Sequence, residues 1–167
     1  MKVLVAYASK YGATAEIAEK IGQVLRESGL SVDVSPVKTA KDIKLYDAIV
    51  LGSAAYMFQW RADAVLFLKK NQNLLAERPI WLFYSGPLGK GHALELVKGQ
   101  RFPKSLKPVI DHIKPRNITV FHGFINIDKL NFFERFAFKK SPAMQGDFRD
   151  WDAIISWAKS IASELKK

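Results

Sequence analysis

Six residues near the start of the chain have the types and spacing of an anion-binding turn. They follow the apolar run at residues 3–7 and precede a helical pattern at residues 15–27. The first N–H groups of a helix have no partner within it, and the helix dipole adds partial positive charge there. Hydroxyl and glycine residues add donors and let the backbone approach a ligand closely. The turn therefore predicts a site for a phosphate monoester, with a capped helix that needs no ligand as the alternative. Its residues are Ser9, Lys10, Tyr11, Gly12, Ala13 and Thr14.

Other phosphate-binding patterns are missing from this turn. It lacks the G-x-x-x-x-G-K-[ST] sequence of nucleoside triphosphate sites and the G-x-G-x-x-G sequence of dinucleotide sites. The 167-residue chain also contains no cysteine. Disulfides, thiolate catalysis, cysteine-ligated zinc and protein-ligated iron–sulfur clusters are thereby excluded. The three histidines are scattered, so no metal site is expected, and redox chemistry would need a bound organic cofactor.

Strand and helix patterns alternate along the whole chain. Near-continuous apolar strands separated by helices indicate a parallel sheet covered on both faces. Because crossover connections are right-handed, five such strands favour a doubly wound α/β fold with strand order 2-1-3-4-5. Residues 1–167 show no linker and no repeat, which predicts a single domain. Strands are expected over residues 2–7, 31–37, 47–53, 79–85 and 117–123, helices over 14–28, 61–75 and 150–165, and longer loops over 86–108 and 124–149.

Two further loops are expected to meet the phosphate turn. Ligands of an open α/β sheet bind beyond the carboxyl ends of the strands, where the strand order reverses. Small residues in both loops leave backbone groups accessible, and an aromatic or methionine side chain can pack on the face of a flat ring. A phosphate site beside a site for a flat ring with polar edges predicts FMN. The expected ring-binding residues are Ser53, Ala54, Ala55, Tyr56 and Met57 from one loop and Ser85, Gly86, Pro87, Leu88 and Gly89 from the other.

The chain resembles the flavodoxins along its whole length. Their first strand ends in [ST]-x-[ST]-G-x-T, which Ser9, Gly12 and Thr14 match, whereas Tyr11 replaces the middle hydroxy residue. The second half is similar to the flavodoxin-domain group that includes the menaquinone-dependent protoporphyrinogen dehydrogenases. This resemblance implies a flavodoxin-like fold, FMN, a setting in heme biosynthesis, and a last loop that contributes to the flavin site and to membrane or partner contacts. The sequences that carry it are WLFYSGPLG at 81–89, FHG at 121–123, FFERF at 132–136 and DWD at 150–152.

Positive charge is concentrated in the second half of the chain. Of the net charge of +10, +7 lies between Lys98 and Lys140, where there are ten lysines and arginines and three acidic residues. Such a field favours an acidic redox protein or an anionic membrane surface, and no nucleic-acid module accompanies it, so no nucleic-acid partner is expected. Residues 130–140 place four phenylalanines among these cations. Two interpretations stay open: a patch that lies on an anionic bilayer, or a docked helix whose rings complete the core or cover the flavin.

Two functions from different classes are compatible with these residues. One is an FMN-dependent oxidoreductase that oxidises a small-molecule substrate and passes electrons to a quinone, as the protoporphyrinogen-type dehydrogenases do. The other is a non-catalytic electron carrier for an acidic protein partner. The chain differs from both groups that it resembles. The segment at residues 136–150 is shorter than expected for a protoporphyrinogen-type dehydrogenase, and the net charge of +10 is opposite in sign to that of electron-carrier flavodoxins, which are typically acidic. No catalytic residue is assigned. Without a signal peptide or an apolar run of ~20 residues, a cytoplasmic protein is expected, with peripheral contact with the inner face of the membrane as an open alternative.

Overall fold

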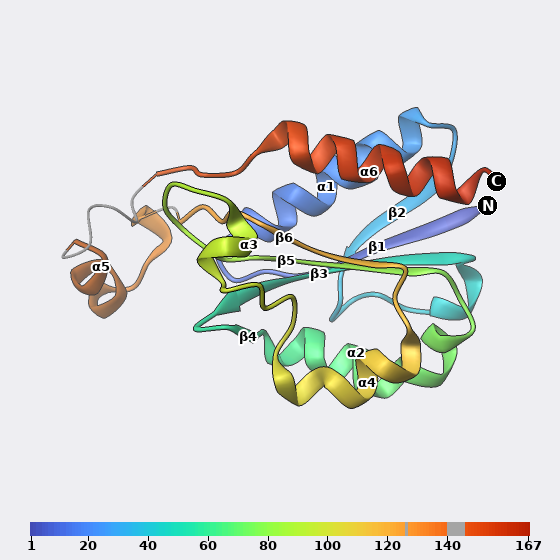
Figure 1. Cartoon of the computed structure of the whole chain (residues 1–167), viewed down its shortest axis with the longest axis horizontal. Helices are drawn as coiled ribbons and strands as arrows, with labels where there is room; N and C mark the ends of the chain where they lie inside the picture. Colours follow the sequence, from blue (N-terminus) through green and yellow to red (C-terminus); the bar gives the residue numbers. More distant parts are fainter. Residues whose placement is uncertain (126, 140–145) are drawn as a thin grey trace.

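A computed structural model describes residues 1–125, 127–139 and 146–167 as a three-layer α/β fold with a central parallel sheet (Figure 1). The order of its long strands is β2-β1-β3-β5-β6, and all four neighbouring pairs are parallel. Numbered along the chain without the short β4, this is the predicted order 2-1-3-4-5. The long strands are β1 (Lys2–Ala8), β2 (Ser31–Pro36), β3 (Ala48–Tyr56), β5 (Ile80–Ser85) and β6 (Asn117–Phe121).

Helices cover both faces of the sheet, as expected for a doubly wound fold. Figure 1 shows α1 and α6 on one side of the sheet and α2 and α4 on the other, with both termini at the same end. The helices are α1 (Ala13–Glu27), α2 (Ala62–Ala76), α3 (Ala93–Leu96), α4 (Lys107–Ile113), α5 (Phe132–Lys139) and α6 (Trp151–Leu165), with short 3-10 turns at Ile43–Leu45, Lys104–Leu106 and Ile127–Lys129.

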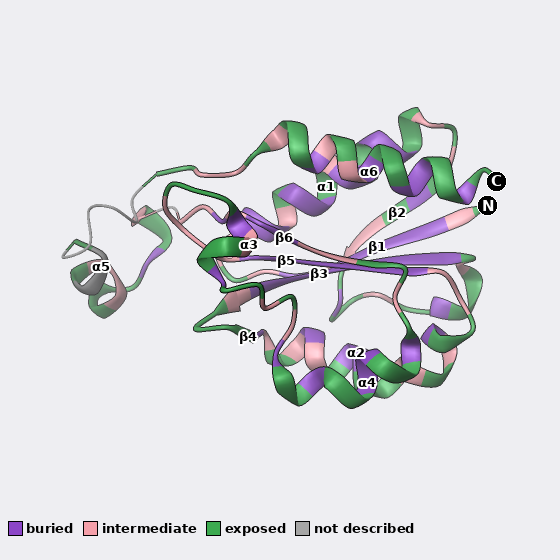
Figure 2. Ribbon diagram, viewed as in Figure 1, coloured by how far each residue is buried: buried purple, intermediate pink, exposed green. Residues whose placement is uncertain are grey.

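Alternation along the apolar strands divides the interior into two cores. In β1, Val3 and Val5 pack under α1 and α6, whereas Leu4 and Ala6 pack under α2 and α4. Successive strand side chains point to opposite faces, so a strand that is apolar throughout must be covered on both. Figure 2 shows this as buried residues along the sheet and on the inner sides of the helices.

The loops at the carboxyl end of the sheet are more structured than the sequence suggests. β3 continues to Tyr56, so the expected end of this strand at Ser53 is wrong. Its last residues pair with the antiparallel strand β4 (Gln59–Trp60), which makes a hairpin of what was expected to be an open loop. Similarly, the expected loop at residues 86–108 contains α3 and the start of α4. These elements are two to seven residues long, too short to give a periodic pattern.

The phenylalanine-rich segment forms α5, which projects beyond the carboxyl end of the sheet (Figure 1). Phe132 and Phe133 are 80% and 81% exposed, and Phe136 is 59% exposed. The interpretation that these three rings complete the core is therefore wrong. The Phe138 side chain and Lys140 lie outside the described residues.

The last helix begins at the expected N-cap, which gives a direct test of local stability. The Asp150 carboxylate accepts a hydrogen bond from the Ala153 N–H at 2.9 Å. We expect Asp150→Ala to lower the free energy of unfolding by about 1 kcal/mol, because the helix loses a partner for one of its first N–H groups. Asp150→Asn keeps an acceptor oxygen and should retain most of that stability. Urea unfolding measures both variants, and equal destabilisation by the two would contradict the capping role.

Candidate functional site

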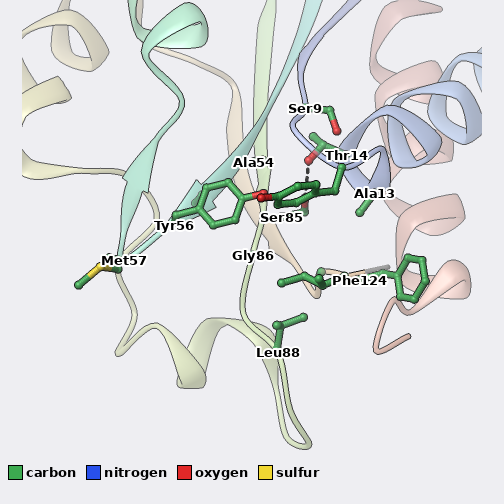
Figure 3. A pocket seen from close by; sticks show the side chains of 14 residues that line it. Ser9, Ala13, Thr14, Ala54, Tyr56, Met57, Ser85, Gly86, Leu88 and Phe124 are labelled. Carbon is green, nitrogen blue, oxygen red and sulfur yellow. Dashed lines mark hydrogen bonds between the residues drawn. The ribbon is translucent and has the colours of Figure 1, made fainter. Parts of the chain in front are cut away.

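The loops that follow four strands enclose a cavity of about 270 Å³ at the carboxyl end of the sheet (Figure 3). It lies above the end of β3, between the loop from β1 and the loops from β5 and β6. The strand order reverses beside this cavity, between β1 and β3, because β2 and β3 lie on opposite sides of β1. The lining residues are Ser9, Tyr11, Ala13, Thr14, Ala54, Ala55, Tyr56, Met57, Ser85, Gly86, Leu88, Gly123, Phe124 and Ile125.

The turn from β1 into α1 directs hydrogen-bond donors towards one end of the cavity. Gly12 occupies the N-cap of α1 with φ of 101°, a left-handed conformation that glycine adopts without strain, and gives no side-chain cap. The first N–H groups of the helix thus remain available to an anion. Ser9 stabilises the turn, because its hydroxyl accepts a hydrogen bond from the Gly12 N–H at 3.1 Å.

A buried hydrogen bond joins the first turn of α1 to the end of β5. The hydroxyl oxygens of Thr14 and Ser85 are 2.8 Å apart, and the residues are 1% and 3% exposed. Figure 3 shows this bond at the edge of the cavity. A hydroxyl has one donor and two acceptor sites. Thr14 can therefore accept from Ser85 and still donate to a ligand in the cavity.

The other end of the cavity is narrow and mostly apolar. Ala54, Ala55, Gly86 and Leu88 line this end. A Cβ atom on Gly86 would lie 2.5 Å from the Ala55 carbonyl oxygen, so the two backbone segments are in direct contact and only glycine lets them approach this closely. Together they form a backbone wall against which a flat ring can lie. Together with the donors at the α1 end, this donor set and shape fit a phosphate attached to a planar aromatic system.

Five of the residues expected at the site do not line the cavity. Ser53 is fully buried within β3, where its hydroxyl donates to the Ala54 carbonyl and accepts from the Arg61 N–H. Pro87 instead accepts hydrogen bonds from the Gly123 N–H and the His122 ring through its carbonyl oxygen. The remaining three shape or flank the loops: Lys10 pairs with Glu134, Gly12 caps α1, and Gly89 has φ of 116° in the loop after β5.

Three lining residues were not named as site residues: Gly123, Phe124 and Ile125, which begin two residues after the end of β6. The resemblance implied only that the last loop as a whole contributes to the flavin site. Their signal was positional, since they begin the loop after the fifth long strand and must reach the same edge of the sheet. A clamp holds this loop in place. Phe124 pairs with Asp147 in an isolated antiparallel bridge. The Arg149 guanidinium lies over the Phe124 ring at 5.0 Å and the Trp151 ring at 4.6 Å, and it pairs with Glu16 and Asp147 at 2.6 Å each.

Two cations connect α5 and its preceding turn to the phosphate turn. The Lys10 ammonium lies 2.5 Å from a Glu134 carboxylate oxygen. The Lys129 ammonium lies 3.4 Å from the Tyr11 carbonyl oxygen. It is also close to Gly12, since a Cβ atom on Gly12 would lie 3.3 Å from the Lys129 nitrogen. Hydrogen bonds from Lys10 and the Asn131 backbone lower the pKa of Glu134 to about 2, so an ionised carboxylate balances the charge of Lys10. The Lys129 ammonium adds positive charge beside the N-terminus of α1.

The ionisable side chains that line the described part of the cavity are both tyrosines. Burial raises the pKa of Tyr11 and of Tyr56 above the ordinary value. Both therefore stay neutral phenols at physiological pH, and neither can serve as a general base there. The rings of Tyr11 and Tyr56 meet edge to face, with centroids 6.4 Å apart. What the cavity offers is binding and orientation, with the reactive chemistry left to a cofactor.

The fold and this cavity define the class of doubly wound α/β proteins that hold a phosphate and a flat ring at the carboxyl ends of their strands. The sequence profile described as "Flavodoxin domain" matches residues 4–152. The chain therefore belongs to the flavodoxin domain family, and this membership implies FMN as its cofactor.

Comparison with individual proteins supports the same fold. The chain is 24% identical over 183 residues to protoporphyrinogen IX dehydrogenase [quinone] of Escherichia coli K12, covering 97% of this chain and 95% of the relative. A flavodoxin from the domain Archaea superimposes with a TM-score of 0.63 at 17% identity over the full length of both chains. Rubredoxin oxygen:oxidoreductase from Desulfovibrio gigas gives a TM-score of 0.65 at 16% identity, covering 99% of this chain and 36% of that one.

The ion pair between Lys10 and Glu134 predicts a measurable shift in titration. A carboxyl with a lowered pKa in the folded state stabilises that state above its unfolded pKa of 4.5, and this contribution is lost as the pH falls towards 2. We expect Lys10→Gln to move the pKa of Glu134 back towards 4.5, as followed by NMR of the side-chain carboxyl. The matched control is Lys20→Gln, since Lys20 bonds to Gln23 instead. An unchanged Glu134 pKa in Lys10→Gln would refute the pairing.

Proposed function

We propose that the protein is an FMN-dependent oxidoreductase that dehydrogenates an apolar, protoporphyrinogen-like substrate and passes the electrons to a quinone. The observation that carries this proposal is a second cavity, also of about 270 Å³, which adjoins the first. Its other walls are mainly apolar, with Phe58, Leu96 and Val97 among them. An apolar substrate there would lie next to the ring end of the first cavity. The residues shared by the two cavities are Ala55, Met57, Gly86 and Leu88.

The chain's own groups would hold the cofactor at both ends. The α1 N-terminus, the Ser9 and Thr14 hydroxyls and the Lys129 ammonium would bind the phosphate. The ring would lie against the wall that Ala55 and Gly86 form, which would exclude water from that face. Bound FMN supplies the transfer of electrons or hydride. In each step the substrate loses two electrons and two protons and one quinone gains them. Three such steps, with three quinones, convert a porphyrinogen into a porphyrin.

The full-length similarity to a quinone-linked dehydrogenase supports the enzyme over a plain carrier. A specific observation favours the second candidate, an electron carrier for an acidic protein partner. The net charge is +10, and no acid–base side chain other than two neutral phenols lines the described part of the cavity. A carrier needs neither a substrate pocket nor a proton donor, whereas the second cavity serves only the enzyme.

The assignment of the phosphate site predicts that the buried hydroxyls of Thr14 and Ser53 differ in their effect on FMN affinity. Thr14→Val should weaken FMN binding by about 10- to 100-fold, because one hydrogen bond to a charged group contributes about 1.5–3 kcal/mol. Binding of riboflavin, which lacks the phosphate, should change far less. Ser53→Ala removes a buried hydroxyl from the same sheet edge but outside the cavity and should leave FMN affinity unchanged. Flavin fluorescence titrations of the apoprotein measure all three. Equal losses for FMN and riboflavin would contradict a phosphate contact of Thr14.

Turnover distinguishes the two candidate functions. The FMN-loaded protein should oxidise protoporphyrinogen with a water-soluble menaquinone analogue as acceptor, followed by porphyrin fluorescence. Leu96→Asp places a charge in the second cavity and should raise KM for the porphyrinogen while the flavin stays bound. Leu66→Asp is the matched control on the outer side of α2, where the side chain is 65% exposed. Reduction by an acidic redox protein without porphyrinogen turnover would instead establish the carrier.

A further inference from the structure

Exposed apolar side chains are concentrated at the carboxyl end of the sheet, the end at which the two cavities lie. Among the described residues, ten large hydrophobic side chains are exposed, and seven belong to the hairpin after β3, to α3 or to α5. All three elements lie at the carboxyl end of the sheet (Figure 1). The remaining three are Met1, Leu45 and Leu66. The seven form what we call the apolar rim: Tyr56, Met57, Phe58, Leu96, Phe132, Phe133 and Phe136.

The two residues at the tip of the β3–β4 hairpin have apolar side chains and an unfavourable backbone conformation. Met57 and Phe58 both have positive φ, 48° and 62°, in the two-residue turn between β3 and β4. Turns with this conformation strongly favour asparagine, aspartate and glycine. Met57 is nonetheless 92% exposed, so packing within the described chain does not account for its presence. Strained residues that persist at such a position are a sign of function.

The helix α5 presents a second apolar projection with cations beside it. The Phe132 and Phe133 rings meet edge to face at 5.8 Å and point away from the core. Lys129 precedes the helix, Arg135 lies within it and Lys139 ends it. The acidic Glu134 on the same helix is paired with Lys10. Apolar rings flanked by cations are the composition of segments that lie in the interface of anionic bilayers.

We propose that the apolar rim and the cations of α5 dock the protein on an anionic lipid bilayer, with the mouth of the cavities facing the membrane. The side chains project from three separate elements around an opening, which suits a fluid surface better than the flat contact of a rigid protein. An apolar quinone dissolved in the bilayer would then reach the cavities without crossing water. Only that last consequence rests on the proposed function, because docking itself requires neither quinone nor turnover. Among the described residues, no helix has the length and apolar character to cross a bilayer, so the contact is peripheral.

Co-sedimentation of the FMN-loaded protein with vesicles tests the docking surface. Binding should be strong to an equimolar mixture of phosphatidylcholine and phosphatidylglycerol, weak to phosphatidylcholine alone, and reduced by salt, since the Debye length is only ~10 Å at 0.1 M. The double variant Phe132→Ser/Phe133→Ser should lower the partition coefficient about tenfold or more. The matched control, Leu45→Ser/Leu66→Ser, removes side chains of 64% and 65% exposure away from the rim and should bind like the parent.

A second pair of variants separates local from overall charge. Arg135→Glu/Lys139→Glu should lower partitioning strongly, because each cation near the surface contributes about fivefold. Lys69→Glu/Lys70→Glu changes the net charge equally on α2 and should have a much smaller effect. Retention of the flavin absorbance confirms that each variant is folded.

Three outcomes would overturn the proposal. In the first, the parent binds equally poorly to both kinds of vesicle; in the second, the rim and control variants lose the same amount of binding. In the third, the parent does not bind vesicles but binds an acidic protein, and the rim variants abolish that binding. Turnover with a water-soluble quinone analogue is measured without vesicles. A failed docking experiment is therefore distinguishable from a failed oxidoreductase assignment.

Discussion

The buried hydrogen bond between Thr14 and Ser85 is the interaction on which the site depends. It joins two residues 71 positions apart, one in the first turn of α1 and the other at the end of β5. Because β3 lies between β1 and β5, the bond passes over the end of the central strand and fixes the distance between the two sides of the cavity. Each hydroxyl is a partner for the other, and an unpaired buried hydroxyl is costly. This contact thus joins the two sides of the candidate site.

Much of the fold could be predicted because the strands and long helices carry strong patterns. β1, β3 and β5 are apolar throughout, and α6 repeats its apolar residues at helical spacing from a recognisable N-cap. The strand order then follows from the handedness of the crossovers. What remained unpredictable is local. The seven-residue α4 and the two-residue β4 depend on packing against α2 and β3 rather than on their own sequence.

The candidate site shows the same division between pattern and packing. The turn at the start of α1 could be found from residue types, since hydroxyls, glycine and a following helix are visible in the sequence. Ser53 was expected in the cavity because the strand was expected to end there. In the structure β3 continues, and the Ser53 hydroxyl is used between Ala54 and Arg61. Phe124 and Ile125 were missed as individual residues. Their position predicts that the loop reaches this edge of the sheet, but their apolar type does not show whether they face a ligand or the core.

The clamp formed by Arg149 has a consequence for how this fold can change. The bridge between Phe124 and Asp147, with the guanidinium stacked between Phe124 and Trp151, brings the two ends of a long excursion side by side at the sheet. The chain between those ends can be lengthened, shortened or exchanged without moving any strand, because the loop closure is already made at its base. The sheet and the loops from β1, β3 and β5 thus stay fixed, whereas the excursion that contains α5 can vary among related chains. Such variation would also change the contacts that Lys129 and Glu134 make to the phosphate turn, and so could adjust the same redox centre to different surroundings.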